Sequence, residues 1–391
     1  MHYLCSAIPQ KGCAVTFINL IIVNFMKKII LCALALMTGL LANAETVEKD
    51  GVSYFLKFYN HTAGVSSVSS RDLNVEKLVI PTSISFEDEE FTVDEVSEKG
   101  LMLGRNTWCK SVVLPSTVKK IGARAFTSSS NLKEVVLPEG LEIINSGTFS
   151  LCESLESIVI PESVKEIHNN AFKGCKALAS FNIPKGITFI GTNAFEECAA
   201  KELVLPEGMT KIPQLAFFRM LKLRKVNIPS TVTEIESSAF GYCLRLSKVK
   251  IPESVTTIGR RAFVGCSCLD TIVIPDGIKI IDVQTFQNCV GLKQIVLPNS
   301  MLLIEDEALA GCENMETLTL PASLRKLDFH CLGGCVGLKK ITNYATTPQE
   351  VFQPFYNDDQ LPSITLEVPK GCSAAYKADS WWGRMNIVEM E

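Results

Sequence analysis

Cysteine is the residue type in this chain that most readily suggests chemistry. The 391 residues include 15 cysteines, of which twelve follow Ala44. Eight of these recur at one position of a repeating pattern, where Ser129 and Met220 also occur. The eight are Cys152, Cys175, Cys198, Cys243, Cys266, Cys289, Cys312 and Cys335.

The spacing of this cysteine row argues against disulfides. Equivalent residues of stacked repeats lie about 4.8 Å apart with parallel Cβ vectors, whereas a disulfide needs Cβ atoms about 3.8 Å apart and turned toward each other. Serine and methionine at the same position cannot form disulfides either. We therefore predict a row of buried, reduced thiols. Cys268 and Cys372 fall outside the row and are the candidates for a reactive or paired thiol.

The sequence offers little for metal binding or catalysis. It has no C-x-x-C pair, and His61, His168 and His330 lie far apart in the chain, so we expect no metal site. The G-x-S-x-G, G-x-x-x-x-G-K and H-E-x-x-H motifs are absent too. We therefore expect neither a cofactor nor an enzymatic activity.

A regular repeat positions all of these residues. The proline of a recurring [VI]-x-[IL]-P element returns at intervals of 23 residues, with a single interval of 22. A period in this range is typical of leucine-rich repeats, and it predicts a solenoid in which each coil stacks on the next. The prolines are Pro115, Pro138, Pro161, Pro184, Pro206, Pro229, Pro252, Pro275, Pro298 and Pro321.

One coil is written L-x-x-V-x-I-P-x-x-V-x-x-I-x-x-x-A-F-x-x-C-x-x, with slot 1 at its first letter. Slots 3 to 6 alternate outward and inward, which predicts a short strand that the proline at slot 7 ends. The part of the coil that follows the proline, which we call the return arm, places apolar residues inward at slots 10, 13, 17 and 18. We expect this arm to be irregular or short-strand backbone. A spine of aromatic rings should fill slot 18, with Leu309 and Leu332 in the last two coils; its members are Phe126, Phe149, Phe172, Phe195, Phe217, Phe240, Phe263 and Phe286.

This coil resembles the BspA-like, or Treponema-type, leucine-rich repeat. The resemblance is carried by the pattern I-P-x-x-V-x-x-I-G-x-x-A-F-x-x-C, which IPESVTTIGRRAFVGC from Ile251 to Cys266 matches slot for slot. It implies a mainly β solenoid and a place among bacterial exported or surface proteins implicated in adhesion.

The ends of the chain differ from the repeat. Residues 1–44 hold an upstream segment and a signal peptide that starts at Met26, with Lys27 and Lys28, the apolar run 29–41 and cleavage after Ala44. The apolar run is too short to span a bilayer core of about 30 Å. We expect an N-terminal cap at 45–104 with a β-hairpin insertion, the solenoid at 105–342 and a C-terminal cap at 343–391.

The charge of the exported chain restricts its partners. Removing residues 1–44 leaves 35 basic and 42 acidic residues, a net charge of −7. This balance disfavours nucleic-acid binding.

The strand face is the surface that such a scaffold offers to partners. Slots 3 and 5 carry no aromatic side chain, which makes this face a poor glycan platform. Val136 and Val159 belong to an exposed valine row that either contacts a partner or only satisfies β propensity.

A basic patch interrupts the valine row at Arg224, Lys225, Lys248 and Lys250. It predicts a dock for an acidic protein region or a sulfated glycan. Alternatively it is a solvated patch that Glu202 and Glu234 balance.

Two functions remain open. The first is a secreted or cell-surface scaffold of a bacterium, for protein–protein interaction or adhesion, with a host matrix or surface protein as a conceivable partner and the periplasm as an alternative location. The second is a carbohydrate-binding accessory protein that uses exposed aromatic residues in the caps. Those aromatics are Tyr54, Tyr59, Phe355, Trp381 and Trp382. For Trp381 and Trp382 the sequence favours a plug that seals the end of the stack over a sugar platform, next to a short helix expected at 373–378.

Overall fold

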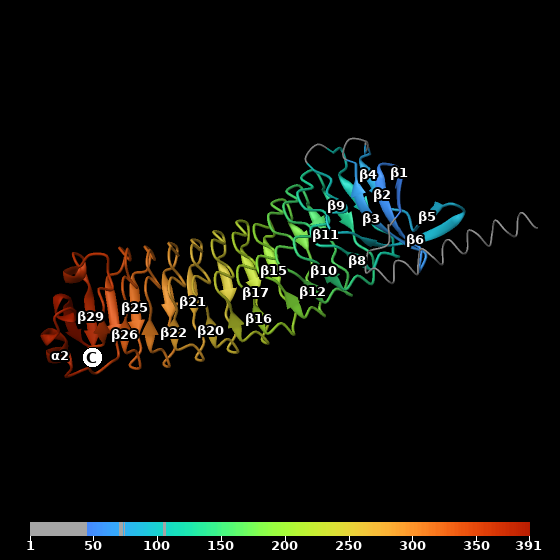
Figure 1. Ribbon diagram of the computed structural model, residues 1–391. Helices are drawn as coiled ribbons and strands as arrows, with labels where there is room; N and C mark the ends of the chain where they lie inside the picture. Colours follow the sequence, from blue (N-terminus) through green and yellow to red (C-terminus); the bar gives the residue numbers. More distant parts are fainter. Residues whose placement is uncertain (1–44, 70–72, 74, 105–106) are drawn as a thin grey trace, which may run out of the picture.

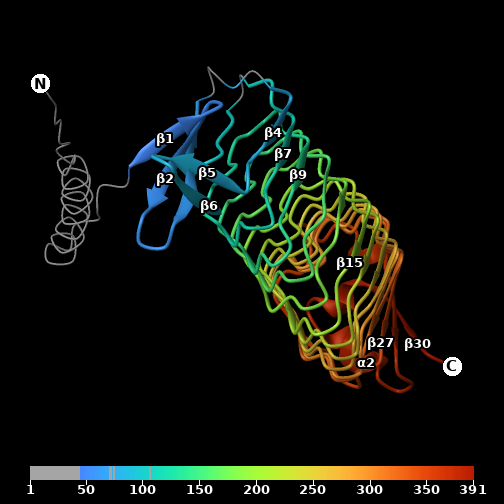
Figure 2. The same cartoon turned by 90° about the vertical axis from the view of Figure 1, so that its right-hand side faces the viewer.

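The computed structural model describes residues 45–69, 73, 75–104 and 107–391. The signal peptide expected within residues 1–44 lies outside these residues. Figure 1 shows an elongated stack of coils with a cap at each end. In Figure 2 the coils lie behind one another, with the C-terminal elements at the far end. The predicted mainly β solenoid is thus confirmed.

The N-terminal cap is a β-sheet that continues into the solenoid. Its strands lie in the order β1-β2-β3-β6-β5, and β6 also pairs in parallel with the first return-arm strand, β8. β5 and β6 form an antiparallel hairpin that turns at Glu87 and Asp88. The cap strands are β1 (Thr46–Lys49), β2 (Val52–Lys57), β3 (Thr62–Val68), β5 (Ser83–Phe86) and β6 (Glu89–Val96).

Slots 3 to 5 of successive coils form the first ladder. Its strands fall into four sheets of parallel strands, in which Val112 pairs with Val135 one repeat on, and the strands of the repeat end before the slot-7 proline as predicted. The strands are β4 (Lys77–Val79), β7 (Ser111–Val113), β9 (Glu134–Val136), β11 (Ser157–Ile158), β13 (Ser180–Phe181), β15 (Glu202–Val204), β17 (Lys225–Asn227), β19 (Lys248–Lys250), β21 (Thr271–Val273), β23 (Gln294–Val296), β25 (Thr317–Leu320) and β27 (Lys340–Asn343).

Slots 12 and 13 form the second ladder, which shows that the return arm contains short strands. Most of its strands fall into three parallel sheets, β10-β12-β14, β16-β18-β20 and β22-β24-β26-β28, in which Lys211 pairs with Glu234 for example. The strands are β8 (Lys120–Ile121), β10 (Ile143–Ile144), β12 (Glu166–Ile167), β14 (Phe189–Ile190), β16 (Lys211–Ile212), β18 (Glu234–Ile235), β20 (Thr257–Ile258), β22 (Ile280–Ile281), β24 (Leu303–Ile304), β26 (Lys326–Leu327) and β28 (Glu350–Val351).

Slots 15 to 20 form a third edge, which we call the turn ladder. Here the N–H groups of slots 16 and 20 donate to carbonyls of the next coil, as in Leu215 to Ser237 at 3.1 Å and Tyr242 to Val264 at 2.6 Å. Both slots adopt left-handed backbone, with φ of 56° at Leu215 and 57° at Tyr242. Non-glycine residues adopt this conformation only where their surroundings enforce it. The bonds between coils supply that enforcement.

The slot-18 rings form the predicted spine. Phe149 stacks on Phe126 at 5.0 Å and on Phe172 at 5.2 Å between ring centroids, and both interplanar angles are at most 16°. The slot-21 thiols pack beside them: the Sγ of Cys152 donates to the Phe126 carbonyl of the preceding coil at 3.1 Å. Each further thiol of the row repeats this bond one coil on. The twelve cysteines of the described residues are unpaired, and the eight thiols of the row are buried, as predicted.

The C-terminal cap closes the other end of the stack. The indole N–H of Trp382 donates to the Gln349 carbonyl at 3.0 Å, and the side-chain amides of Asn343 and Gln349 bond each other at 2.7 and 2.8 Å in the interior. Trp382 thus seals the end, as predicted. The cap elements are η1 (Leu361–Ser363), β29 (Thr365–Val368), α2 (Ser373–Ala378), η2 (Trp382–Arg384) and β30 (Asn386–Glu389).

Candidate functional site

The structure brings the four candidate cations together on the first ladder. Lys225 pairs in register with Lys248, and Asn227 pairs with Lys250. The Arg224 N–H donates to the Lys201 carbonyl at 2.7 Å, which extends the group by one more cation. All of these side chains are exposed. Within the described residues, none of them forms an ion pair. We call Lys201, Arg224, Lys225, Lys248 and Lys250 the basic patch.

One of the two acids expected to balance this patch lies elsewhere. Glu202 does occupy the adjacent strand, in register with Lys225. Glu234 instead belongs to β18 of the second ladder, beside Lys211. The period of the coil places slot 12 in a different sheet from slots 3 and 5, so Glu234 does not face the patch.

Other coils pair their slot-2 cations with acids of a neighbouring coil. Lys133 Nζ lies 2.7 Å from Glu156, and Lys293 Nζ lies 3.1 Å from Asp270. Lys339 makes the same contact with Glu316 at 3.3 Å.

The basic patch departs from this pattern of paired slot-2 cations. Residues 201–261 hold eleven lysines and arginines against five acids, a local net charge of +6 in a chain of net −4.

The two candidate valines lie on the same face but outside the basic patch. Val136 and Val159 are 44% and 77% exposed, and they precede Asn182 and Val204 in the slot-5 row. Single exposed apolar residues are normal on protein surfaces. The structure therefore separates the valines from the cations by intervening coils.

Four of the five cap aromatics that the carbohydrate-binding alternative requires are buried, so they do not form a sugar platform. Tyr54 points into the cap core because alternate residues of β2 face inward. Phe355 and Trp381 stack at 6.0 Å within the C-terminal seal, and Trp382 bonds inside it. Only Tyr59 of the five is exposed, at 82%.

The thiols of the row are unsuited to nucleophilic chemistry. Burial raises the pKa of Cys152, Cys243 and Cys289 to about 12. A thiolate is the reactive form, so these thiols are inert at neutral pH. Cys268 is exposed and Cys372 is partly buried. Among the described residues, no group of histidines, cysteines and acids is placed to hold a metal ion.

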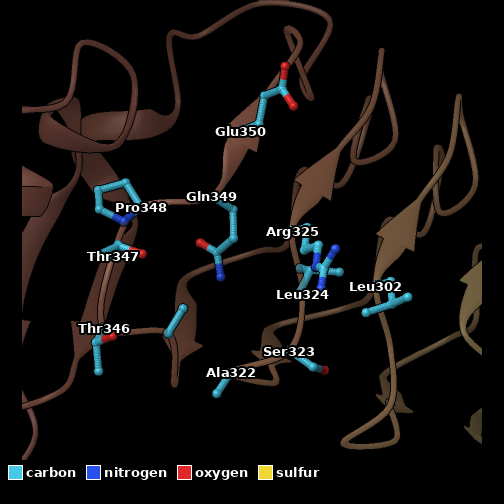
Figure 3. Close-up of a pocket in the computed structure, with 11 residues that line it drawn as sticks. Leu302, Ala322, Ser323, Leu324, Arg325, Thr346, Thr347, Pro348, Gln349 and Glu350 are labelled. Atoms are coloured by element: carbon cyan, nitrogen blue, oxygen red, sulfur yellow. The ribbon is translucent and has the colours of Figure 1, made fainter.

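Two hollows mark the surface. One, of about 460 Å³, lies where the last coils meet the segment that leads into the C-terminal cap. Figure 3 shows Ser323 and Arg325 on the coil side and Thr347 and Gln349 on the cap side. The Gln349 amide is already engaged by Asn343.

The second hollow, of about 450 Å³, lies on the turn ladder around Tyr242, Arg260 and Arg261. Sequence reasoning missed it. The available signal was the pair of adjacent arginines next to the aromatic residues Phe218 and Tyr242 at slots 19 and 20.

Within the described part of the chain, no helix has the length and apolar character needed to cross a membrane.

Comparison with known proteins identifies the repeat family of this chain and solved structures with a similar fold. Residues 105–220, 210–339 and 257–370 match the model of the BspA type leucine rich repeat region, in six copies. The fold is similar to that of a leucine-rich repeat protein from Bacteroides ovatus, at 22% identity and a TM-score of 0.58, with 88% of this chain and 100% of that chain covered.

The fold is also similar to that of the pneumococcal vaccine antigen PcpA, at 18% identity and a TM-score of 0.53, with 89% and 99% covered. No curated protein sequence matches the chain closely enough to count as a relative. The family model spans well over half of the residues. The chain belongs to the BspA-type leucine-rich repeat family.

Proposed function

We propose that this protein is an exported, non-catalytic scaffold that captures an acidic region of a protein partner on the basic patch. The carrying observation is the unpaired cluster of exposed cations on the first ladder, within a segment of local net charge +6. Leucine-rich repeat solenoids offer extended surfaces suited to protein binding. Export is supported by the tripartite signal in residues 26–44 and by the family, whose structural neighbours include a vaccine antigen.

The geometry of the patch suits a protein surface better than a small ligand. The cations stand on short parallel strands and face outward without an aromatic neighbour at slots 3 and 5. Lys225 and Lys248 lie side by side, and the repulsion between their like charges destabilises the free protein. Binding of an acidic partner would relieve this repulsion. Such complementary charge acts mainly on the association rate and makes it sensitive to salt.

The test compares two triple charge reversals. Lys225→Glu, Lys248→Glu and Lys250→Glu together should abolish binding to any hit from a panel of purified extracellular-matrix proteins, and to a polyglutamate peptide. The control reverses Lys133, Lys293 and Lys339, which changes the net charge equally on other coils. Binding is measured at low and physiological salt, and thermal unfolding serves as a check of folding. Equal affinity in the two triple variants would remove the basic patch from the proposal.

Export is tested by the mass of the mature protein. We expect the chain recovered outside the cytoplasm to start at Glu45. A product that retains residues 26–44 would contradict the signal-peptide interpretation.

A further inference from the structure

The hollow on the turn ladder lies where three coils pack closely around a buried glycine. Gly241 occupies slot 19, between Phe218 and Val264 of the neighbouring coils. A Cβ atom there would lie 3.0 Å from the Phe218 ring and 3.1 Å from Val264 Cγ1. These distances are tighter than ordinary van der Waals contact, so the missing side chain of Gly241 lets Phe218 and Val264, which both line the hollow, pack this closely.

An aromatic ring forms one wall of the hollow. Tyr242 packs edge-on against Phe218, with ring centroids 5.6 Å apart and an interplanar angle of 87°. Its ring also lies against Gly265, where a Cβ atom would approach Tyr242 Cδ1 to 2.7 Å. These neighbours hold the ring in place while it stays 42% exposed. Tyr242 therefore presents apolar surface and a phenolic hydroxyl in a fixed position.

Cations and hydroxyls form the rest of the rim. Arg260 and Arg261 are both exposed. Arg261 Nε donates to the Gln284 side chain, and among the described residues neither guanidinium forms an ion pair. Ser237 Oγ donates to the Arg260 carbonyl at 3.0 Å and keeps its capacity to accept.

An acid near the hollow is already neutralised. The Glu236 carboxylate accepts from Lys211 Nζ at 2.6 Å and from the Gln214 N–H at 2.8 Å. The Glu307 carboxylate also lies at this edge, where it accepts from the side-chain amides of Gln284 and Gln287. The two guanidinium groups of Arg260 and Arg261 outweigh this one carboxylate, so the rim is net positive and favours an anion.

We propose that this hollow binds the acidic unit of a glycan, a sugar that carries a carboxylate or a sulfate. The exposed ring matches the apolar face of a sugar, and a guanidinium binds a carboxylate or sulfate through paired N–H donors. The serine hydroxyls match the hydroxyl groups of the sugar. A volume of about 450 Å³ is within the range of small-ligand sites, about 300–1,000 Å³.

A glycan fits this hollow better than an acidic peptide does. The N–H groups of slots 16 and 20 are used in bonds between coils, so the edge offers few free backbone donors for an extended strand. The site shares no residue with the basic patch. Failure of one proposal therefore leaves the other unaffected.

The experiment titrates the mature chain, residues 45–391, with defined saccharides. The probes are 3′-sialyllactose and a hyaluronan tetrasaccharide for carboxylates, a heparin tetrasaccharide for sulfates, and lactose as the neutral reference. Calorimetry and ligand-observed NMR measure binding. We expect at least one acidic probe to bind and lactose to bind at least about tenfold more weakly, because lactose lacks the charge-assisted bonds. Which acidic probe binds identifies the anion. Binding of a hexaglutamate peptide at the hollow, with no acidic sugar bound, would overturn the proposal.

Variants locate the site. The double change Arg260→Gln with Arg261→Gln should lower the affinity for the acidic probe by at least about tenfold. Tyr242→Leu should lower this affinity severalfold. Leucine is tolerated at this slot, since Leu151 adopts the same left-handed backbone in an earlier coil. The matched control, Lys225→Gln with Lys248→Gln, removes the same charge from the strand face and should leave affinity within about twofold. Loss of binding in this control alone, or in none of the variants, would place the glycan elsewhere and refute the assignment.

Discussion

In the spine of slot-18 rings, the contribution of ring stacking to stability can be measured separately from the contribution of burial. Three slot-18 phenylalanines are fully buried but contact different numbers of rings within the described residues. Phe286 stacks on one ring at 5.5 Å. Phe149 stacks on two, at 5.0 and 5.2 Å. Phe195 stacks on three, at 5.2, 5.8 and 4.7 Å. Leucine is the natural replacement, because Leu309 and Leu332 fill this slot in later coils.

The expected losses form a graded series. Phenylalanine-to-alanine changes in cores cost about 3–5 kcal/mol, and leucine keeps much of the apolar volume, so burial alone should cost about 1–2 kcal/mol at each site. Each lost ring pair should add about 0.5–1.5 kcal/mol. We therefore expect about 2, 3 and 4 kcal/mol of lost unfolding free energy for Phe286→Leu, Phe149→Leu and Phe195→Leu.

Native-state hydrogen exchange is the appropriate assay, since coils contact only their neighbours and open locally. The opening free energy of the amides around each substituted coil is compared with the same amides in the parent chain. Urea unfolding followed by circular dichroism gives the global value. Equal losses at all three sites would show that ring stacking adds nothing beyond burial and would refute the reasoning.

Three further outcomes are expected. Iodoacetamide should label Cys268 and Cys372 in the native protein, whereas the ten buried thiols should react only in denaturant; rapid native labelling of the row would contradict its burial. Burial and the Asp282 carboxylate raise the pKa of Glu305, so its ionisation opposes folding once the pH rises above its unfolded value of about 4.3. Glu305→Gln should therefore raise the melting temperature at pH 7 and leave it unchanged near pH 3, and a gain of equal size at both pH values would argue against this cause. Asn343→Ala should cost about 1–3 kcal/mol in urea unfolding, because it leaves the buried Gln349 amide without its partner; the double change of Asn343 and Gln349 to leucine should cost less, and a larger cost would count against this account of the pair.

The basic patch and the hollow on the turn ladder differ in how far the sequence alone predicts them. Lys225, Lys248 and Lys250 were predicted to converge because slots 3 and 5 repeat with the coil, and register alone places them on adjacent strands. The hollow on the turn ladder depends on three coils, which contribute Phe218, Tyr242 and Val264 to its lining. Slot 19 has no constant residue type, so no periodic signal marked it. The sequence left the exposure of the cap aromatics open, because exposure at a chain end depends on the packing of neighbouring segments.

By itself, the sequence determined the 23-residue coil, the corner at each proline and the burial of the thiol row, because a strict period forces equivalent residues into equivalent surroundings. It also indicated the short helix α2 and the Trp382 seal at the C-terminal end. Only the tertiary structure decided the backbone of the turn ladder. Residues such as Leu215 and Tyr242 have no local preference for positive φ, and they adopt it because their N–H groups bond carbonyls of the next coil. Those bonds exist only once the coils are stacked.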